Sequence, residues 1–226
     1  MKILLIETST SVCSVALADG DRIVNQRQTD DPNAHSTRLP LFVSQLMPAS
    51  GLDAVCVSSG PGSYTGLRIG VSTAKGICYA LGIPLLAVPT LQAMASHYFS
   101  LHPDYRGLVC PMIDARRMEC YTLIASRDAV IRPTQADVIV SGIYDQYLDS
   151  GLLTFIGNGA FKTQPILGQH PNARFEPFTV SAPALLPLAQ RMLAQGETAD
   201  VAYFEPFYLK DFVAKKSVVH GLRVTV

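Results

Sequence analysis

A short apolar strand, a glycine–proline turn and a long helix follow one another between Ala54 and Gly82, and this stretch constrains the fold most strongly. Residues Ala54 to Ser58 are apolar and β-branched, as a buried strand requires. The Gly60-Pro61-Gly62 turn ends the strand, because proline cannot extend a ladder of hydrogen bonds. Ser63 or Thr65 is suited to cap a helix that ends at Gly82. The order predicts a helix packed on a sheet.

The expected helix has three faces, which follow from its period of 3.6 residues. An apolar stripe should face the sheet, and it consists of Leu67, Val71, Ala74, Cys78 and Leu81. A second stripe would let another helix approach closely, and it consists of Gly66, Gly70, Thr73, Ile77 and Ala80. A third, wetter face carries Arg68, Ser72 and Lys75. The second stripe predicts a partner interface.

Phosphate-binding and nucleophile motifs are absent from this stretch of sequence. A dinucleotide Gly-x-Gly-x-x-Gly motif would need glycine at Thr65, and no Gly-Lys-Ser/Thr follows Gly60 or Gly62. Ser63 is not in a Gly-x-Ser-x-Gly elbow, because Pro61 and Thr65 occupy the glycine positions. The stretch alone therefore names no reaction.

The run Gly60-Pro-Gly-Ser-Tyr-Thr-Gly-Leu-Arg-Ile-Gly70 resembles the signature of the bacterial TsaB (YeaZ) family, whose members are similar to the larger TsaD proteins. The resemblance extends over most of the chain. Further landmarks occur in the family's order, namely Ile3 to Thr10 with Cys13 to Leu17, His35 to Pro40, Ile113 to Arg117, and Glu205-Pro206 with Tyr208-Leu209. The resemblance implies a function in the synthesis of threonylcarbamoyladenosine, a modification next to the anticodon of tRNA.

Composition limits the classes of function. The 18 basic and 18 acidic residues cancel, so no strongly basic field exists to hold nucleic acid unaided. The mean hydropathy of +0.23 indicates an ordered chain and some apolar surface that a partner covers. Five cysteines without a Cys-x-x-Cys motif are typical of buried, reduced thiols. The apolar run after Lys2 is too short for a signal peptide, and no stretch could span a membrane, so we expect a cytoplasmic protein.

The first 104 residues predict one lobe of an α/β fold. The expected elements are strands at Lys2–Glu7, Val12–Ala18, Arg22–Gln28, Ala54–Ser58 and Pro84–Val88, and helices from Asn33, from Ser63 and from Thr90 to Phe99. Pro40 predicts a kink or a start in the first helix, because its nitrogen cannot donate. Three antiparallel strands followed by two parallel ones are the half-domain pattern of actin-like, sugar-kinase-like (ASKHA) folds, which the resemblance also implies.

Residues 105–226 predict a second, smaller lobe with the same layout, again a mixed sheet with helices. The expected elements are a hairpin of Leu108–Ile113 and Cys120–Ala125, a strand near Ala129–Arg132, a helix near Ser141–Leu148, a strand at Leu153–Ile156 and a helix at Ser181–Gln195. The tail after Pro206 could pack back on the first lobe or cover a partner. The resemblance favours a helix near Asp211 to Lys216.

The polar residues indicate no metal site and one candidate nucleotide loop. TsaD-like relatives carry a His-x-x-x-His metal pair, but here the equivalent positions hold Thr90 and Met94, so we predict no metal site. Glu7-Thr8-Ser9-Thr10 could be the remnant of a phosphate loop, or its hydroxyls could simply satisfy turn amides. No catalytic residue is predicted.

Charged residues lie at the expected hairpin tip, namely Asp114, Arg116, Arg117 and Glu119. They could form a solvated turn or a charged contact to a partner or tRNA, since arginine pairs suit phosphate. His35 cannot be placed in an acid–base pair and is interpreted as an interface or surface histidine.

Two hypotheses of function follow. The first, implied by the resemblance, is a non-catalytic accessory subunit that binds a TsaD-like threonylcarbamoyltransferase, with a TsaE-like ATPase in the assembly. ATP and metal would belong to those partners, tRNA would be reached only through the complex, and a homodimer could use the same face. The predicted interface consists of His35, Arg38, Phe42, Gly66, Ile69, Gly70, Thr73 and Ile77. In this hypothesis Gly70→Arg or Thr73→Arg leaves the monomer folded but breaks partner binding. The second hypothesis is an enzyme acting alone, either a sialoglycoprotease-type metallopeptidase or an ATP-dependent actin-like phosphotransferase.

Overall fold

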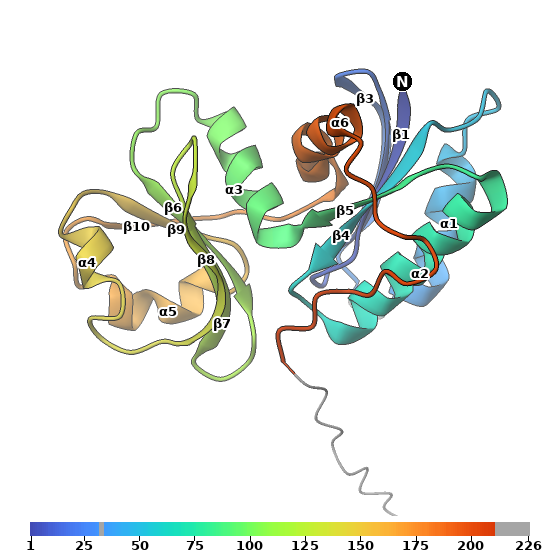
Figure 1. The fold of residues 1–226 in the computed structure, drawn as a ribbon. Coiled ribbons are helices and arrows are strands. Elements are labelled where there is room, and N and C mark those ends of the chain that lie inside the picture. Colours follow the sequence, from blue (N-terminus) through green and yellow to red (C-terminus); the bar gives the residue numbers. More distant parts are fainter. Residues whose placement is uncertain (32–33, 211–226) are drawn as a thin grey trace, which may run out of the picture.

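A computed structural model describes residues 1–31 and 34–210, which form two lobes that each contain a five-stranded mixed sheet (Figure 1). The strand orders are β3-β2-β1-β4-β5 and β8-β7-β6-β9-β10, so the second sheet repeats the first strand by strand. This arrangement confirms the predicted α/β, actin-like class with two similar lobes. No helix within the described residues is long and apolar enough to cross a membrane.

The first sheet begins with an antiparallel meander of β1 (Lys2–Glu7), β2 (Cys13–Asp19) and β3 (Arg22–Thr29). Two further strands, β4 (Ala54–Gly60) and β5 (Leu85–Pro89), extend it parallel to β1. These bounds lie within a few residues of the predicted ones. The central strands β1 and β4 are buried almost throughout, as their apolar runs require.

Two helices cover one face of the first sheet, namely α1 (His35–Leu46) and α2 (Tyr64–Leu81). The helix α1 begins before Pro40, so the proline lies inside it. Ser63 caps α2 by accepting a hydrogen bond from the amide of Gly66, and Gly82 ends it at a left-handed φ of 65°. Four residues of the predicted apolar stripe are buried, but Leu81 is 50% exposed because it lies in the last turn beyond the edge of the core.

The second sheet contains β6 (Leu108–Asp114), β7 (Glu119–Ala125), β8 (Val130–Val138), β9 (Leu153–Ile156) and β10 (Ala173–Glu176). The helix predicted near residues 141–148 is only the single turn α4 (Asp145–Leu148). The strand predicted near Ala129 runs on to Val138, because it pairs with β7 along its length. Helix α5 (Ala160–Leu167) and β10 were not predicted.

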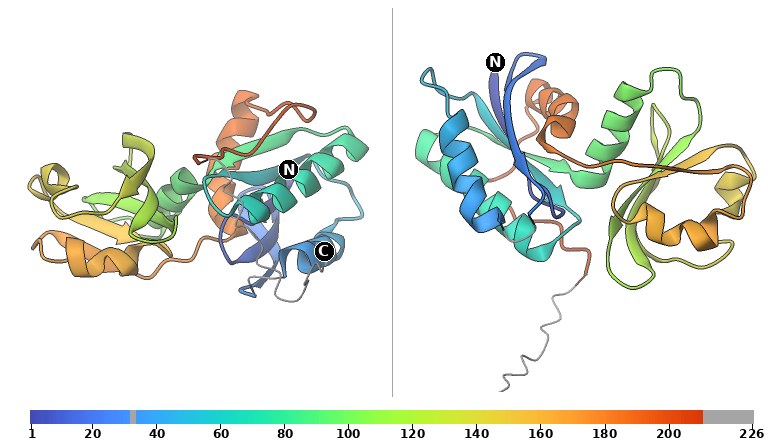
Figure 2. Two further views of the ribbon diagram at one scale, coloured as in Figure 1. Left: turned by 90° about the horizontal axis from the view of Figure 1, so that it is seen from below. Right: turned by 180° about the vertical axis from the view of Figure 1, so that it is seen from behind.

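Each lobe ends in a helix that packs against the other lobe (Figures 1 and 2). Helix α3 (Thr90–Leu101) follows the first sheet, yet its side chains share a core with β6 and β7. The 3-10 turn η1 (Ala182–Leu185) and α6 (Leu186–Gln195) follow the second sheet, yet they share a core with β1, β2, β4 and β5. Residues 182–195 therefore belong structurally to the first lobe, which differs from the predicted division at residue 104. The predicted single helix at Ser181–Gln195 is this pair of elements.

The C-terminal segment from Ala199 to Lys210 crosses the first lobe. Ala199 pairs with Leu85, and the Lys75 ammonium donates to the carbonyls of Ala202 and Phe204 at 3.1 and 2.9 Å. The predicted wet face of α2 is therefore partly covered by this segment at Lys75. The helix predicted near Asp211 to Lys216 lies outside the described residues.

Candidate functional site

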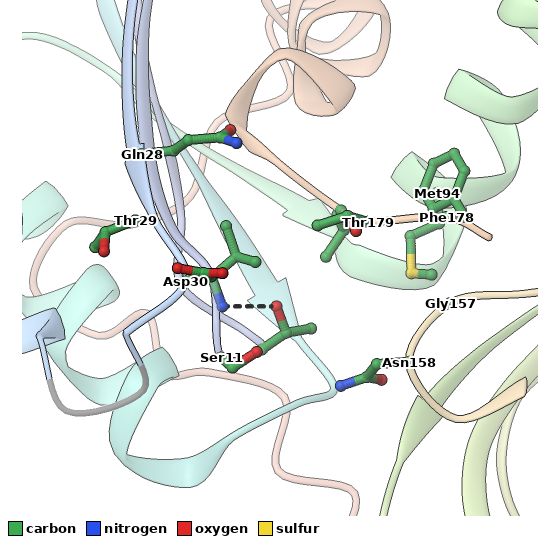
Figure 3. A pocket seen from close by; sticks show the side chains of 12 residues that line it. Ser11, Gln28, Thr29, Asp30, Met94, Gly157, Asn158, Phe178 and Thr179 are labelled. Atoms are coloured by element: carbon green, nitrogen blue, oxygen red, sulfur yellow. Dashed lines mark hydrogen bonds between the residues drawn. The ribbon is translucent and has the colours of Figure 1, made fainter. Parts of the chain in front are cut away.

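A polar cleft separates the two lobes at the turn between β1 and β2 (Figure 3). The cavity has a volume of about 530 Å³. Its lining comes from both lobes and from the irregular segment between β10 and η1, and it comprises Thr10, Ser11, Val12, Gln28, Thr29, Asp30, Met94, Gly157, Asn158, Phe178, Thr179 and Val180. Within the part of the chain that the structure describes, Asp30 is the one charged side chain in that lining, and the other polar groups are hydroxyls and amides. The lining thus offers no cation to an anionic ligand.

The predicted phosphate-loop remnant folds inward rather than toward the cleft. Glu7 is fully buried at the end of β1, where its Oε1 accepts hydrogen bonds from the Ser9 amide at 2.6 Å and the Ser58 hydroxyl at 3.0 Å. Burial raises the pKa of the Glu7 carboxyl, against the opposing effect of these hydrogen bonds. Thr8 and Ser9 are also buried, and only Thr10 lines the cavity.

Three glycines allow Thr8 and Ser9 to lie directly on α2 and the turn before it. A β-carbon at Gly66 would lie 2.1 Å from the Thr8 carbonyl oxygen, and one at Gly70 would lie 2.2 Å from the Thr8 hydroxyl. A β-carbon at Gly62 would lie 2.3 Å from the Ser9 carbonyl oxygen, which accepts a hydrogen bond from the Ser63 amide at 2.7 Å. The chain's own backbone therefore closes the N-terminus of α2, where related folds could hold phosphate.

This packing corrects two predictions. Gly66 and Gly70 are buried against Thr8, so their small size serves contact within the chain, and they are not surface residues of a partner interface. Gly70→Arg cannot leave the monomer intact, because even a methyl group collides with Thr8.

A triphosphate or a catalytic metal does not fit the residues present. Among the described residues the cleft lining carries no lysine or arginine, and the Ser63 and Gly66 amides at the α2 N-terminus donate within the chain. Thr90 accepts a hydrogen bond from the Gly60 amide at 3.2 Å, and Met94 lines the cleft. No group of three potential metal ligands occurs within residues 1–31 and 34–210.

The five cysteines are buried and unpaired, as predicted. Burial raises the pKa of the Cys13, Cys78 and Cys120 thiols to about 11, so they remain protonated and behave as small apolar side chains.

The outward side of α1 and α2 forms a second candidate site. Of the predicted interface residues, Arg38 is exposed, and Phe42, Ile69, Thr73 and Ile77 are half-buried. His35 is buried, and its Nε2 has no hydrogen-bond partner among the described residues. We call this surface the helical face, and it comprises Arg38, Phe42, Ile69, Ser72, Thr73, Gly76, Ile77 and Ala80.

Ser72 and Gly76 are exposed small residues on α2 that lay outside the predicted small-residue stripe, and the exposed Ala80 belonged to that stripe but not to the predicted interface residues. A β-carbon added at Gly76 would meet no atom within 4 Å. The small-residue stripe that faces outward is thus rotated from the predicted one. The outward position of Gly76 could have been predicted from the spacing of Leu67, Val71, Ala74 and Cys78. These four residues are buried, and they lie opposite Gly76 on a helical wheel.

Comparisons with known proteins assign the chain to a family. The TsaD family profile, described as tRNA N6-adenosine threonylcarbamoyltransferase, matches residues 30–157, which is more than half of the chain. The tRNA threonylcarbamoyladenosine biosynthesis protein TsaB of Escherichia coli K12 is 33% identical over 237 residues, covering 96% of this chain and 98% of that protein. TsaB of Bacillus subtilis 168 is 39% identical over 127 residues, which is 54% of each protein.

A solved structure agrees with these sequence relatives. YeaZ from Pseudomonas aeruginosa superposes with a TM-score of 0.77 at 27% identity, covering 92% of this chain and 99% of that chain. The chain belongs to the TsaB (YeaZ) family of tRNA threonylcarbamoyladenosine biosynthesis proteins.

Proposed function

We propose that this chain is a non-catalytic accessory subunit that binds a TsaD-like threonylcarbamoyltransferase during threonylcarbamoyladenosine formation on tRNA. The partner supplies the metal and the transfer chemistry, and a TsaE-like ATPase completes the assembly. This chain needs no cofactor of its own, and tRNA reaches it as part of the complex.

The observation that carries the proposal is the closed loop beside α2. Actin-like folds bind phosphate where a turn exposes backbone amides at the cleft. Here Thr8 and Ser9 occupy that space, held by contacts that glycine alone permits at Gly66 and Gly70. The fold is retained in full while its usual reaction site is filled by the chain itself. We expect a chain of this kind to bind other subunits of an assembly and not to catalyse the reaction itself.

The helical face is the surface that we assign to the partner. It lies on two adjacent helices of 12 and 18 residues, whose inner sides are anchored in the first core. The half-buried Phe42, Ile69 and Ile77 keep apolar area at the surface, and Ser72, Gly76 and Ala80 let another helix come close. Helix-on-helix packing with small residues at the contact brings the two backbones together and excludes water.

A second copy of the chain could use the same face. The apolar edges of α1 and α2 would then be covered in a homodimer, and the TsaD-like partner would compete with that dimer. The oligomeric state of the isolated chain should therefore change when the partner is added.

The test is co-purification with the TsaD-like protein of the same genome, using three arginine variants. Gly76→Arg and Thr73→Arg place a long side chain on the helical face, and Gly76→Arg does so in open space, so the fold should persist. Ser100→Arg is the matched control, because Ser100 is exposed on α3 outside the helical face. We expect at least about tenfold weaker binding of the partner for the first two variants and no change for the control. Native affinity of a folded Gly76→Arg protein would show that the helical face is not the interface.

A further inference from the structure

The hairpin between β6 and β7 has an unusual backbone at its tip. Arg116 and Arg117 have φ values of 73° and 50°, and they are the only non-glycine residues with positive φ within residues 1–31 and 34–210. The turn is fixed by hydrogen bonds from the Glu119 amide to the Arg116 carbonyl at 3.2 Å and from the Arg116 amide to the Asp114 carboxylate at 2.8 Å. Left-handed backbone is costly for arginine, and such strain is concentrated at functional sites.

Both acids of the hairpin are neutralised by lysines from elsewhere in the chain. Lys162 of α5 forms an ion pair with Asp114 and also donates to the carbonyls of Arg117 and Glu119 at 2.8 and 2.7 Å. Lys210 of the C-terminal segment forms an ion pair with Glu119. The tip therefore has four cationic side chains against two acidic ones, so an excess of two positive charges remains on a chain whose net charge is zero.

The two arginines provide that excess. Arg116 and Arg117 are exposed, and neither guanidinium makes a hydrogen bond or ion pair with the described part of the chain. The acids that would otherwise pair with them are held by Lys162 and Lys210. Two adjacent guanidinium groups, with their N–H donors, thus face solvent on a turn whose backbone is held by hydrogen bonds.

We propose that this tip, defined by Arg116 and Arg117, binds the phosphate backbone of tRNA in the assembly. Guanidinium groups bind phosphate oxygens bidentately, and exposed arginines on a fixed turn lose little freedom on binding. Phosphate contacts position an RNA without reading its sequence, which suits a subunit that does not perform the transfer. The inference rests on the proposed function, because an isolated excess of two charges is too small to hold RNA alone at physiological salt.

The test is the affinity of the reconstituted assembly for labelled tRNA at several salt concentrations. The variant is Arg116→Asn/Arg117→Asn, because asparagine tolerates positive φ and removes both charges. The matched control is Arg22→Gln/Arg191→Gln, which removes two exposed arginines from the first lobe. We expect about tenfold weaker tRNA binding for the tip variant, and a plot of log affinity against log salt that is shallower by about 1 to 2. The control should bind tRNA nearly as the unmodified chain does.

The remaining outcomes separate this inference from the proposed function. Tip-variant affinity and salt dependence equal to those of the control would overturn it. So would loss of the TsaD-like partner by a folded tip variant, because the arginines would then contact an acidic protein surface. If the unmodified chain fails to bind that partner, the proposed function is wrong. In that case labelled tRNA is titrated with the isolated chain at low salt. Weaker binding by the tip variant than by the control supports the inference, and equal binding overturns it. A variant with glycine at both positions, which suits positive φ still better, replaces the asparagine variant if that one is unstable.

Discussion

The first lobe buries Glu7 among the Ser9 and Ser58 groups, whereas the second lobe buries Asp137 against the Arg132 guanidinium. Burial raises the pKa of Glu7. Burial also opposes ionisation of Asp137, but hydrogen bonds from Arg132, Thr122 and Tyr144 outweigh it and lower the pKa. The same strand order therefore holds one acid that favours its neutral form and one that favours its charged form. The groups around each carboxyl, and not the order of the strands, decide which protonation state is favoured.

The helices differ as much as the acids do. The first lobe has α1 and α2, of 12 and 18 residues, where the second has α4 and α5, of 4 and 8 residues. The long helices α1 and α2 carry the helical face, whereas the short helix α5 contributes Lys162 to the hairpin tip of β6 and β7. We propose helix-mediated protein contact for the first lobe and phosphate contact for the second.

The largest expected effect comes from removing the charge of Asp137. Asp137→Asn leaves the Arg132 guanidinium buried without its counterion, and it weakens the bond from the Tyr144 hydroxyl, which lies 2.6 Å from Asp137. We expect a loss of about 3 kcal/mol in the free energy of unfolding, measured by urea denaturation. Asp128→Asn, at an exposed acid, should change it by less than about 0.5 kcal/mol. Similar losses in both variants would remove the proposed distinction between the lobes.

Two glycines of α2 should respond with opposite signs to the same substitution. Gly70→Ala brings a β-carbon to 2.2 Å from the Thr8 hydroxyl, so it should destabilise by about 2 kcal/mol. Gly76→Ala meets no atom within 4 Å and should stabilise by about 0.5 to 1 kcal/mol, because alanine favours the helix. Thermal denaturation of both proteins measures the difference. A Gly70→Ala protein as stable as the Gly76→Ala protein would mean that Thr8 does not pack on α2.

The smallest effect concerns the pH dependence of Glu7. Its folded-state pKa is raised above 4.5, so its contribution to stability is present below that pH and is lost as pH rises through the folded pKa. Glu7→Gln keeps an acceptor for the Ser9 and Ser58 bonds but cannot ionise. The melting temperature of the unmodified chain should therefore fall relative to Glu7→Gln as the pH rises above 4.5, the ordinary pKa of the group. A constant difference above that pH would contradict the raised pKa.

Much of the fold followed from sequence because its signals are local. Alternating or continuous apolar runs gave β1 to β7, and Ser63 and Gly82 marked the ends of α2. Helix α5 and β10 escaped prediction because they are short and mix polar with apolar residues. The exchange of α3 and α6 between lobes also could not be predicted, since an apolar helix face does not specify which sheet it covers.

The site was predicted less well than the fold, for a reason visible in α2. Glycine is suited both to a helix contact at the surface and to close packing inside, so Gly66 and Gly70 were assigned outward when they face Thr8. At the hairpin tip, the sequence favoured a solvated turn and left a charged contact to a partner or tRNA as the alternative. Arginine does not by its residue type predict a positive φ, so the backbone of Arg116 and Arg117 could not be foreseen. The lysines that neutralise Asp114 and Glu119 are distant in sequence, and a local pattern cannot bring them to the tip.

The most direct test of the account is the yield of threonylcarbamoyladenosine on tRNA with and without this chain. The assay contains the TsaD-like protein and the TsaE-like ATPase of the same genome, the small-molecule substrates and a tRNA that accepts the modification. We predict that modification requires this chain and that this chain alone transfers nothing. The Gly76→Arg chain should fail to support modification, because it does not assemble with the TsaD-like protein. Full modification without this chain, or turnover of ATP or peptide by this chain alone, would contradict the account.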